Sequence, residues 1–469
     1  MKIILIAGLL ASALSACNTT SNAVVVAPVA AAPKNVIFFL GDGMGMTTLT
    51  AARTYAVGED GELTIDTLPE TAFIKTYSND AQVTDSAPSM AAYMTGVKMN
   101  NEVISMSADT QAKEPGKDGS NGCVDNNGKS VTTLLEIAKA TGLATGVVTT
   151  TRVTHATPAA TYAHICHRDA ENDIAAQFVP GGKGYNPALA DGVDVMLGGG
   201  SQFFYPTAAK GKRTDGRDLV AELKAKGYGF AGTRAEFDAL DVSKTAKFVG
   251  LFASSHMSYD LDRDAAKEPS LAEMTVKAIQ GLKKNNKGMF LMVEGGRIDH
   301  ALHETTAKKA LQDTVAFDDA IKAALAEIKK TDPELKNTLI VVTADHDHTL
   351  VLNGYAKRTG KSSATNPGVL GLVKDVVSGK LSTDADGMPY TIIGFGNGES
   401  RGDRKTALDE SVVFANSYHQ EAAIRTTAGN ETHGGTNVFL GAVGKGSDQF
   451  YGVMDNTNVF KLIRDAVGL

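Results

Sequence analysis

The stretch Met289-Phe290-Leu291-Met292-Val293-Glu294-Gly295-Gly296-Arg297-Ile298-Asp299-His300-Ala301-Leu302-His303 joins a continuous apolar run to a cluster of acids and histidines. The apolar part, Met289–Val293, has no polar interruption, as is typical of a strand buried on both faces of a largely parallel sheet. Asp299 and His303 are four residues apart, so on a turn of helix they share one face and can bind the same metal ion. Glu294 offers a third carboxylate where the strand ends. The stretch therefore predicts a buried strand whose end opens into a polar site.

Similar apolar runs alternate with helical segments along the rest of the chain. Further strands are expected at Asn35–Leu40, Ala144–Thr149, Val193–Leu197, Leu339–Val342 and Thr391–Ile393, and helices at Val131–Ala140, Leu271–Leu282 and Thr305–Ile328. This alternation predicts a three-layer α/β/α sandwich with a largely parallel central sheet. Residues 349–432 are rich in Gly, Ser, Lys and Asp and interrupt the rhythm. We expect an inserted cap or crown segment there, which projects over the sheet edge as a lid or a dimer contact.

The first residues resemble an export signal. Lys2 supplies a positive charge, and Ile3–Leu14 is apolar or small but too short to span a bilayer. Leu14-Ser15-Ala16-Cys17 resembles a bacterial lipobox. We therefore expect a signal peptide over residues 1–17 and lipidation of Cys17; the alternative is ordinary cleavage near Ala16.

The segment after Cys17 looks like a tether. Residues 18–33 are rich in Ala, Val, Pro, Ser, Thr and Asn. Asn18, in place of Asp, is compatible with sorting to the outer membrane. The chain is therefore expected to be an exported, periplasmic lipoprotein, with its catalytic domain at residues 34–469 and no membrane contact except the anchor at Cys17.

Two cysteines remain besides Cys17, namely Cys123 and Cys166. Two cysteines in an oxidising compartment are natural disulfide partners. A disulfide between them is expected, and the alternative is a pair of free buried thiols.

The charge of the chain gives no sign of nucleic-acid binding. The formal net charge is −7, and the sequence has no clustered basic stripe of the kind that nucleic-acid-binding proteins usually carry. An anionic substrate is still compatible with this charge, because bound metal ions attract anions locally. We therefore expect a small-molecule substrate and no nucleic-acid partner.

Two polar motifs in the first part of the chain lie where a strand ends and where a helix begins. Asp42 stands between two glycines after the strand Asn35–Leu40, so the chain can turn and aim the carboxylate at a metal ion; a plain turn is the alternative. Ser86 lies two residues before Pro88, which suits the first turn of a helix. The positive end of a helix favours an alkoxide and an incoming phosphate, whereas a simple helix cap is the alternative role of Ser86.

His155 and Thr157 follow the strand Ala144–Thr149. Their spacing places both on one side of an extended chain, and a threonine hydroxyl suits a hard cation such as Mg²⁺. Arg168 is a candidate phosphate clamp, because its planar fork can hold two phosphoryl oxygens. Arg152 competes for this role on spacing alone.

Acids and histidines also follow the strand Leu339–Val342. In Asp345-His346-Asp347-His348 the first acid and histidine can approach one ion, and the second pair stays open as further ligands. His433 is a single candidate ligand from a distant segment. Together with the hydroxyl groups, these acids and histidines suit borderline and hard divalent ions.

These segments, in this order, resemble the alkaline phosphatase family. The matching stretches are Asp42–Gly45, Thr84–Ser86, Thr150–Pro158, Val293–His303, Thr343–His348 and Thr432–Gly435. The resemblance runs from about Asn35 to the C-terminus, is weakest in residues 349–432, and is specific because six separated motifs coincide. It implies an alkaline phosphatase that hydrolyses phosphate monoesters and releases inorganic phosphate, and a homodimer, which is common in the family.

The resemblance also implies a role for each site residue. Ser86 resembles the nucleophile that forms a phosphoserine intermediate, and Arg168 resembles the residue that binds the phosphate. One Zn²⁺ would be held by Asp299, His303 and His433, a second Zn²⁺ by Asp42, Asp345 and His346, and one Mg²⁺ by Asp42, Thr157 and Glu294. His155 and His300 resemble the His-bearing subgroup, which includes animal enzymes, where the best-known enterobacterial form has Asp and Lys. These two histidines are expected to tune magnesium affinity and rate rather than the type of reaction.

Two other functions compete with this one. A sulfatase or phosphodiesterase of the same superfamily is the nearest rival, because Ser86–Ala91 partly resembles the sulfatase maturation sequence. Met90 stands where that sequence has Arg, which argues against it. The second rival, an inactive metal-stabilised surface lipoprotein, predicts lost ligands or a replaced serine, and every expected position is filled.

Overall fold

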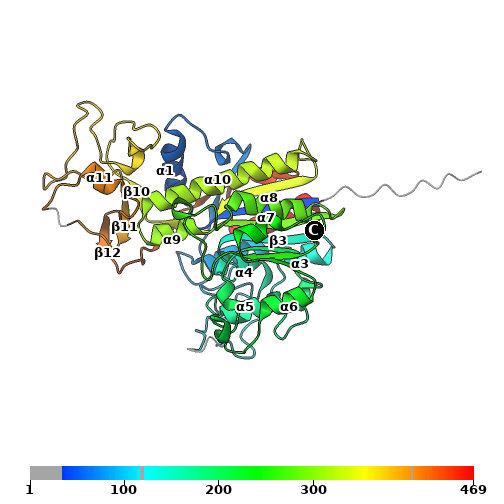
Figure 1. The fold of residues 1–469 in the computed structure, drawn as a ribbon. Helices are drawn as coiled ribbons and strands as arrows, with labels where there is room; N and C mark the ends of the chain where they lie inside the picture. The colour runs from blue at the N-terminus through cyan, green and yellow to red at the C-terminus, as the bar shows by residue number, and fades with distance from the viewer. Residues whose placement is uncertain (1–33, 117–120, 403–404) are drawn as a thin grey trace, which may run out of the picture. The chain divides into compact units, whose positions relative to one another are not determined.

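The computed structural model describes residues 34–469 except 117–120 and 403–404. The predicted signal peptide (1–17), the lipidation site Cys17 and the tether (18–33) lie outside these residues. In the described part, ten strands form one sheet in the order β15-β2-β14-β8-β1-β7-β3-β4-β6-β5. The neighbouring strands are parallel, except that β14 runs antiparallel to both β8 and β2. The predicted α/β sandwich with a largely parallel sheet is therefore confirmed (Figure 1).

Helices cover both faces of this sheet. α8 and α10 pack together on one face, and α2 and α4 pack together on the other (Figure 1). The strands are β1 Lys34–Gly41, β2 Glu70–Lys75, β3 Ala144–Arg152, β4 Val195–Gly199, β5 Gly229–Ala231, β6 Phe248–Leu251, β7 Gly288–Gly295, β8 Thr338–Ala344, β14 Val438–Gly444 and β15 Gly452–Asp455. The main helices are α1 Met46–Val57, α2 Ser86–Thr95, α3 Leu134–Ala140, α4 Ala156–Tyr162, α5 Glu171–Phe178, α8 Leu271–Leu282, α9 Arg297–His303, α10 Ala307–Lys329 and α12 Asn456–Val467.

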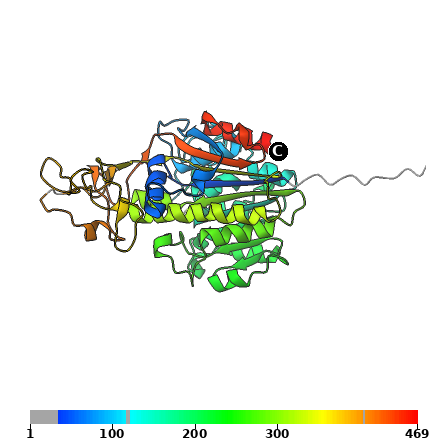
Figure 2. The same ribbon diagram turned by 90° about the horizontal axis from the view of Figure 1, so that it is seen from above.

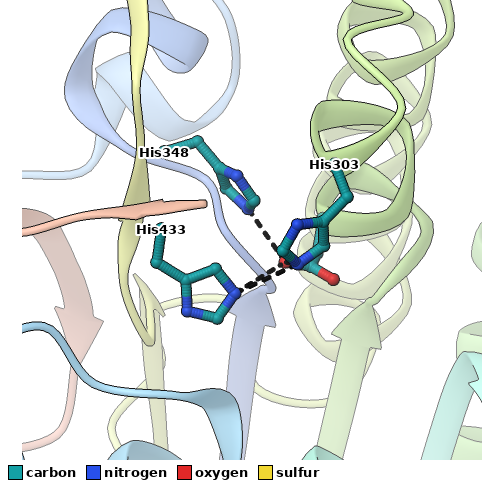
Figure 3. Close-up of side chains that lie close together, drawn as sticks. His303, His348 and His433 are labelled. Atoms are coloured by element: carbon teal, nitrogen blue, oxygen red, sulfur yellow. Dashed lines mark hydrogen bonds and ion pairs between the residues drawn. The ribbon is translucent and has the colours of Figure 1, made fainter. Parts of the chain in front are cut away.

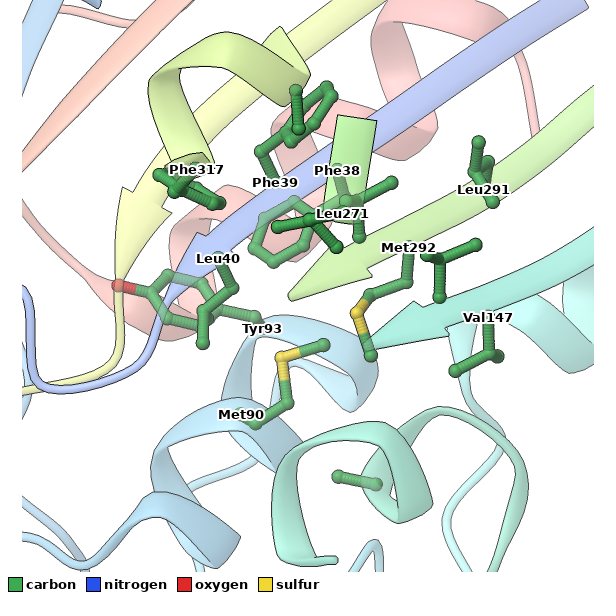
Figure 4. Close-up of a cluster of buried hydrophobic side chains, with 14 of the residues drawn as sticks. Phe38, Phe39, Leu40, Met90, Tyr93, Val147, Leu271, Leu291, Met292 and Phe317 are labelled. Atoms are coloured by element: carbon green, nitrogen blue, oxygen red, sulfur yellow. The ribbon is translucent and has the colours of Figure 1, made fainter. Parts of the chain in front are cut away.

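The central strand β1 is apolar from Val36 to Leu40 because both of its faces are buried there. Successive side chains of a strand point to opposite faces. The Phe38 ring lies 5.5 Å from the Tyr93 ring of α2, and the Phe39 ring lies 5.9 Å from the Phe317 ring of α10 (Figure 4). The Tyr93 hydroxyl donates a hydrogen bond to the Ala344 carbonyl oxygen at 2.9 Å. This bond ties α2 to the end of β8, where the polar motifs begin.

Some predicted boundaries were wrong by a few residues. α3 begins at Leu134 rather than Val131, because Thr133 and Glu136 form a capping box that starts the helix there. α10 begins at Ala307, after Thr305 takes a φ of 55° that ends the preceding turn. The strand expected at Thr391–Ile393 forms later, as β11 Ile393–Gly398.

The segment 349–432 carries a small sheet of its own. β10 (Leu350–Leu352), β11 and β12 (Ala422–Arg425) form three strands in that order. Figure 2 shows α10 running along the sandwich toward this segment. The two ends of the segment are joined, because β9 (Asp347–His348) pairs with β13 (His433–Gly434). The insertion therefore begins and ends at the same place, beside the candidate ligands; a lid or dimer role stays a prediction.

The sulfur atoms of Cys123 and Cys166 lie at bonding distance, with Cα atoms 5.7 Å apart and 43 residues of separation. This geometry agrees with the expected disulfide rather than with two free thiols.

We predict that replacing Cys123 and Cys166 together by serine lowers the free energy of unfolding by about 2–4 kcal/mol, because a closed loop of this length restricts the unfolded chain. Urea denaturation of both proteins, with and without reductant, measures the loss. Reductant should destabilise the natural protein to the level of the double variant. An unfolding curve of the natural protein that reductant leaves unchanged would contradict the disulfide.

Candidate metal centre and active site

The carboxyl ends of three adjacent strands bring the polar motifs together. Leu40 of β1 lies opposite Glu294 of β7 on one side and Thr343 of β8 on the other. Asp42 and Asp345 follow directly, so the acids of three distant segments meet at one edge of the sheet. This is the edge at which open α/β sheets place their sites.

Ser86 lies at the start of α2 but does not cap it. Asp85 is the cap, because its carboxylate accepts a hydrogen bond from the Ala87 backbone N–H at 2.7 Å. The Ser86 hydroxyl instead faces Asp42 Oδ1 at 3.3 Å and His346 Nε2 at 3.2 Å. The alternative role of Ser86 as a helix cap is therefore wrong.

Asp42, Asp345 and His346 form one group of potential ligands around Ser86. His346 Nε2 lies 3.3 Å from Asp42 Oδ1 and 3.5 Å from Asp345 Oδ2, and all three side chains are fully buried. Burial and the negative charge of Asp299 raise the pKa of Asp42 to about 7; burial and the charge of Asp42 raise the pKa of Asp345 to about 7. Two buried carboxylates that resist ionisation in this way indicate a place for a cation.

Asp299, His303 and His433 form a second group, to which His348 also belongs (Figure 3). His303 Nδ1 donates to the Glu431 carbonyl oxygen, and His433 Nδ1 donates to the Thr84 carbonyl oxygen at 2.8 Å. With Nδ1 protonated, each neutral imidazole has its lone pair on Nε2. The two Nε2 atoms nevertheless lie 3.1 Å apart, and Asp299 Oδ1 is 3.3 Å and 3.5 Å away from them. Two imidazole nitrogens and a carboxylate oxygen that converge in this way suit a metal ion.

His348 orients this group through two carboxylates. Its Nε2 lies 2.8 Å from Asp299 Oδ1, and its Nδ1 lies 2.5 Å from Glu431 Oε2. Burial alone would lower the pKa of His348, but Glu431 and Asp299 outweigh it and raise the pKa to about 10. Nε2 therefore holds Asp299 in place, while Nδ1 fixes the His348 ring to Glu431. The remaining open candidate, Asp347, accepts hydrogen bonds from Thr436 and from the His348 backbone N–H and belongs to neither group.

A third group of oxygens lies between Asp42 and Glu294. Thr157 Oγ1 is 3.4 Å from Asp42 Oδ2, and Glu294 accepts hydrogen bonds from Thr149 and, at 3.1 Å, from Thr151. Burial, followed by the charge of Asp42, raises the pKa of Glu294 well above its usual value. This set of carboxylate and hydroxyl oxygens suits a hard cation.

The chain is not extended from His155 to Thr157, so the spacing argument for an extended chain does not apply. His155 is the N-cap residue of α4, and Thr157 lies in the first turn of that helix, where Pro158 favours helical backbone. His155 nevertheless lies beside the acids, in a group with Asp42 and Glu294. The start of α4, rather than an extended strand, thus brings His155 and Thr157 to the acids.

A cluster of three histidines lies next to this group. The rings of His155 and His300 are 5.3 Å apart, and the His256 ring lies 5.3 Å from His155 and 4.2 Å from His300. Burial lowers the pKa of all three imidazoles, that of His300 to about 3, so they are neutral. Sequence reasoning missed His256, which stands in Ser254-Ser255-His256-Met257 with no partner at helical or strand spacing.

The structure distinguishes between the two candidate phosphate clamps, Arg152 and Arg168. Both sides of the Arg152 fork are bound to Glu171, at 2.8 Å each. Arg168 reaches the site instead: its guanidinium lies 3.0 Å from Asp85 Oδ1 and 3.1 Å from His155 Nε2. Arg168 therefore stands next to Ser86 with N–H groups that can bind an anion.

Two buried oxygens of these groups have no hydrogen-bond partner in the described structure, namely Asp345 Oδ2 and Glu294 Oε1. Buried polar atoms are rarely left without a partner, so each implies a ligand that satisfies it. The donor set therefore fits divalent cations on both sides of Asp42.

Comparison with known proteins agrees with this geometry. The model of the alkaline phosphatase family matches residues 33–469. The chain belongs to the alkaline phosphatase family. A human relative, the tissue-nonspecific isozyme of alkaline phosphatase, is 38% identical over 91% of this chain and 82% of its own. A Bombyx mori relative, 35% identical over 91% of this chain and 78% of its own, is named a membrane-bound alkaline phosphatase.

A solved structure has the same fold. It is a mutant of the TAB5 alkaline phosphatase with Mg bound in a site called M3, 26% identical, with a TM-score of 0.64 over 93% of this chain and 98% of its own. The chain is thus an enzyme of a metal-dependent family whose reaction is the hydrolysis of phosphate monoesters, and its residues form the candidate ligand groups described above.

We predict that Glu431→Gln weakens binding of a divalent cation by the group Asp299, His303 and His433 by about tenfold to a hundredfold, because partners that orient metal ligands contribute this much to affinity. Competition with a chelator, followed by metal analysis, measures the change.

Glu399→Gln is the matched control for this experiment, since Glu399 accepts a hydrogen bond from Gly429 in the same insertion. Equal metal affinity in the two variants would show that Glu431 does not support the centre.

Proposed function

We propose that this enzyme hydrolyses phosphate monoesters through a phosphoserine intermediate on Ser86, at a centre of two Zn²⁺ ions and one Mg²⁺ ion. Asp299, His303 and His433 hold one Zn²⁺; Asp42, Asp345 and His346 hold the other; Asp42, Thr157 and Glu294 hold Mg²⁺. The observation that carries the proposal is the position of the Ser86 hydroxyl, within 3.3 Å of both Asp42 and His346. A nucleophile that touches the ligands of a cation is activated by that cation.

The reaction takes two displacements at phosphorus. Ser86 Oγ forms a bond to phosphorus while the ester P–O bond breaks and the alcohol leaves. A water oxygen then bonds to phosphorus, the serine O–P bond breaks, and inorganic phosphate leaves. Bound metal ions supply the positive charge that lowers the pKa of the serine hydroxyl and of water and offsets charge on the leaving oxygen.

The residues of the chain orient the phosphoryl group. The Arg168 fork binds two of its oxygens while Asp85 and His155 hold the guanidinium in place. The N-terminus of α2 directs backbone N–H groups toward the same region. His155 is neutral and buried and borders the oxygens proposed for Mg²⁺, and His300 is neutral and half-buried and lies against His155. Both tune the affinity for Mg²⁺.

The cellular setting is part of the proposal. Among the described residues, no helix has the length and apolar character needed to cross a bilayer. We assign export by residues 1–17, a lipid anchor at Cys17 in the outer membrane, and a homodimer to which residues 349–432 contribute.

Ser86→Ala is expected to lower kcat/KM for p-nitrophenyl phosphate by at least about a thousandfold, because it removes the attacking oxygen. The assay is run with Zn²⁺ and Mg²⁺ and again after chelation, beside a phosphodiester and a sulfate ester. Ser130→Ala, an exposed serine far from the ligands in sequence, is the control. A dominant diesterase or sulfatase rate would contradict the proposed reaction, and activity that survives chelation would contradict the metal centre.

Arg168→Lys should lower kcat/KM for the same substrate by about tenfold to a hundredfold, since lysine keeps the charge but loses the two-pronged contact. It should also raise the inhibition constant of inorganic phosphate. Arg234→Lys, which changes a solvent-exposed ion pair with Asp238, is the control. A phosphate inhibition constant that stays constant in Arg168→Lys would assign the clamp to another residue.

A further inference from the structure

An open groove lies next to the segment that leads to Ser86. Residues 75–83 line it together with Gly435 and Asn437, and its volume is about 740 Å³. None of these residues belongs to the proposed ligand groups or to the phosphate clamp. The groove is therefore separate from the chemistry at phosphorus and needs its own explanation.

The topology places the groove at the same edge of the sheet as the metal ligands. β14 runs antiparallel to β8 and to β2, so β2 and β8 run in the same direction and end at the same edge. Ile74 pairs with Val438, which sets the residues after Ile74 beside the residues before Val438. Only β14 lies between the strand that leads to Asp345 and the strand that leads into the groove.

The near end of the groove shares its wall with the site. Thr84, next to Val83, accepts the hydrogen bond from His433 Nδ1 at 2.8 Å. Val83 also packs closely against Gly435. A Cβ atom added to Gly435 would lie 3.1 Å from Val83 Cγ2. Val83 is three residues before Ser86, and three residues span at most about 10 Å. A group attached to a phosphate at Ser86 can therefore reach Val83.

The groove presents an ordered aromatic ring. Tyr77 is 44% exposed and Val83 is 37% exposed, and both line the groove. The Lys98 ammonium lies 3.7 Å from the centre of the Tyr77 ring, and the Tyr77 hydroxyl is hydrogen-bonded to Asp455. Because Lys98 and Asp455 already fix the Tyr77 ring, the ring loses little conformational entropy when another ring stacks on it.

The rest of the lining suits a ring with polar edges. Gln82 and Asn437 bring side-chain amides into the same groove, and an amide can both donate and accept hydrogen bonds. A nucleobase has such edges around an aromatic face, whereas a short alkyl alcohol has neither a stacking face nor the length to reach the ring.

We propose that this groove binds the leaving group of the ester and selects aryl and nucleoside monophosphates over short alkyl phosphates, with Tyr77 as the stacking platform and Val83 as the wall next to phosphorus. The proposal rests on the proposed function, because it names the substrate class of the same site.

Tyr77→Ala is expected to lower kcat/KM for adenosine 5′-monophosphate by about threefold to tenfold, through KM rather than kcat, because one stacking contact is lost. The value for glycerol 2-phosphate should stay constant, and Tyr77→Phe, which keeps the ring, should retain the preference for the nucleotide. Tyr451→Ala is the matched control: Tyr451 is 69% exposed and precedes β15, which runs parallel to β2, so it lies at the opposite edge of the sheet.

If Tyr77→Ala lowered kcat/KM equally for both substrates, or left kcat/KM for the nucleotide unchanged, the proposed role of the groove would be wrong. Natural enzyme that cleaves neither monoester in the presence of Zn²⁺ and Mg²⁺ would instead overturn the proposed function, so the two failures are distinguishable.

Discussion

Buried negative charge at the carboxyl edge of the sheet is the constraint on which the rest of the structure depends. Asp42, Asp345 and Glu294 are fully buried and lie within reach of one another, and Asp299 is 4% exposed. Carboxylates so placed either stay protonated or bind cations, since isolated buried charges cost too much free energy. The arrangement therefore fits the metal dependence of the family, and the proposed roles of the serine, the arginine and the histidines depend on it.

The scaffold answers this constraint by fixing the positions of the acids at the ends of the strands. β1, β7 and β8 are parallel and in register, so their ends stop at one level and three acids meet. The helix α2 is tied to the same level, because the Ser89 hydroxyl donates to the Asp345 carbonyl oxygen at 2.7 Å. The buried aromatic contacts on both faces of β1 stabilise this register. A shift by one residue would move Phe38 and Phe39 to the opposite faces of the sheet and break both contacts.

The sequence predicted what is encoded locally and missed what depends on tertiary contacts. The run Met289–Val293 and the pair Asp299 and His303 are short-range patterns, so the strand and the start of the ligand group were predictable. His256 and Glu431 approach the site from loops with no pattern. The choice between Arg152 and Arg168 required Glu171, which binds the Arg152 fork from another helix. β2 escaped prediction because only two of its six residues are buried, at alternate positions near the edge of the sheet.

The position of β2, one strand in from the outermost strand β15, explains why the groove and the metal centre can serve different purposes. The ligands follow strands at the middle of the sheet, where every neighbour is packed and a change disturbs the core. The groove follows β2, which has exposed side chains such as Phe73, 45% exposed. Substitutions at exposed positions usually change stability little. Reaction chemistry is thus held by the buried central strands, while the proposed substrate preference depends on the segment after β2, which can vary without moving a metal ligand.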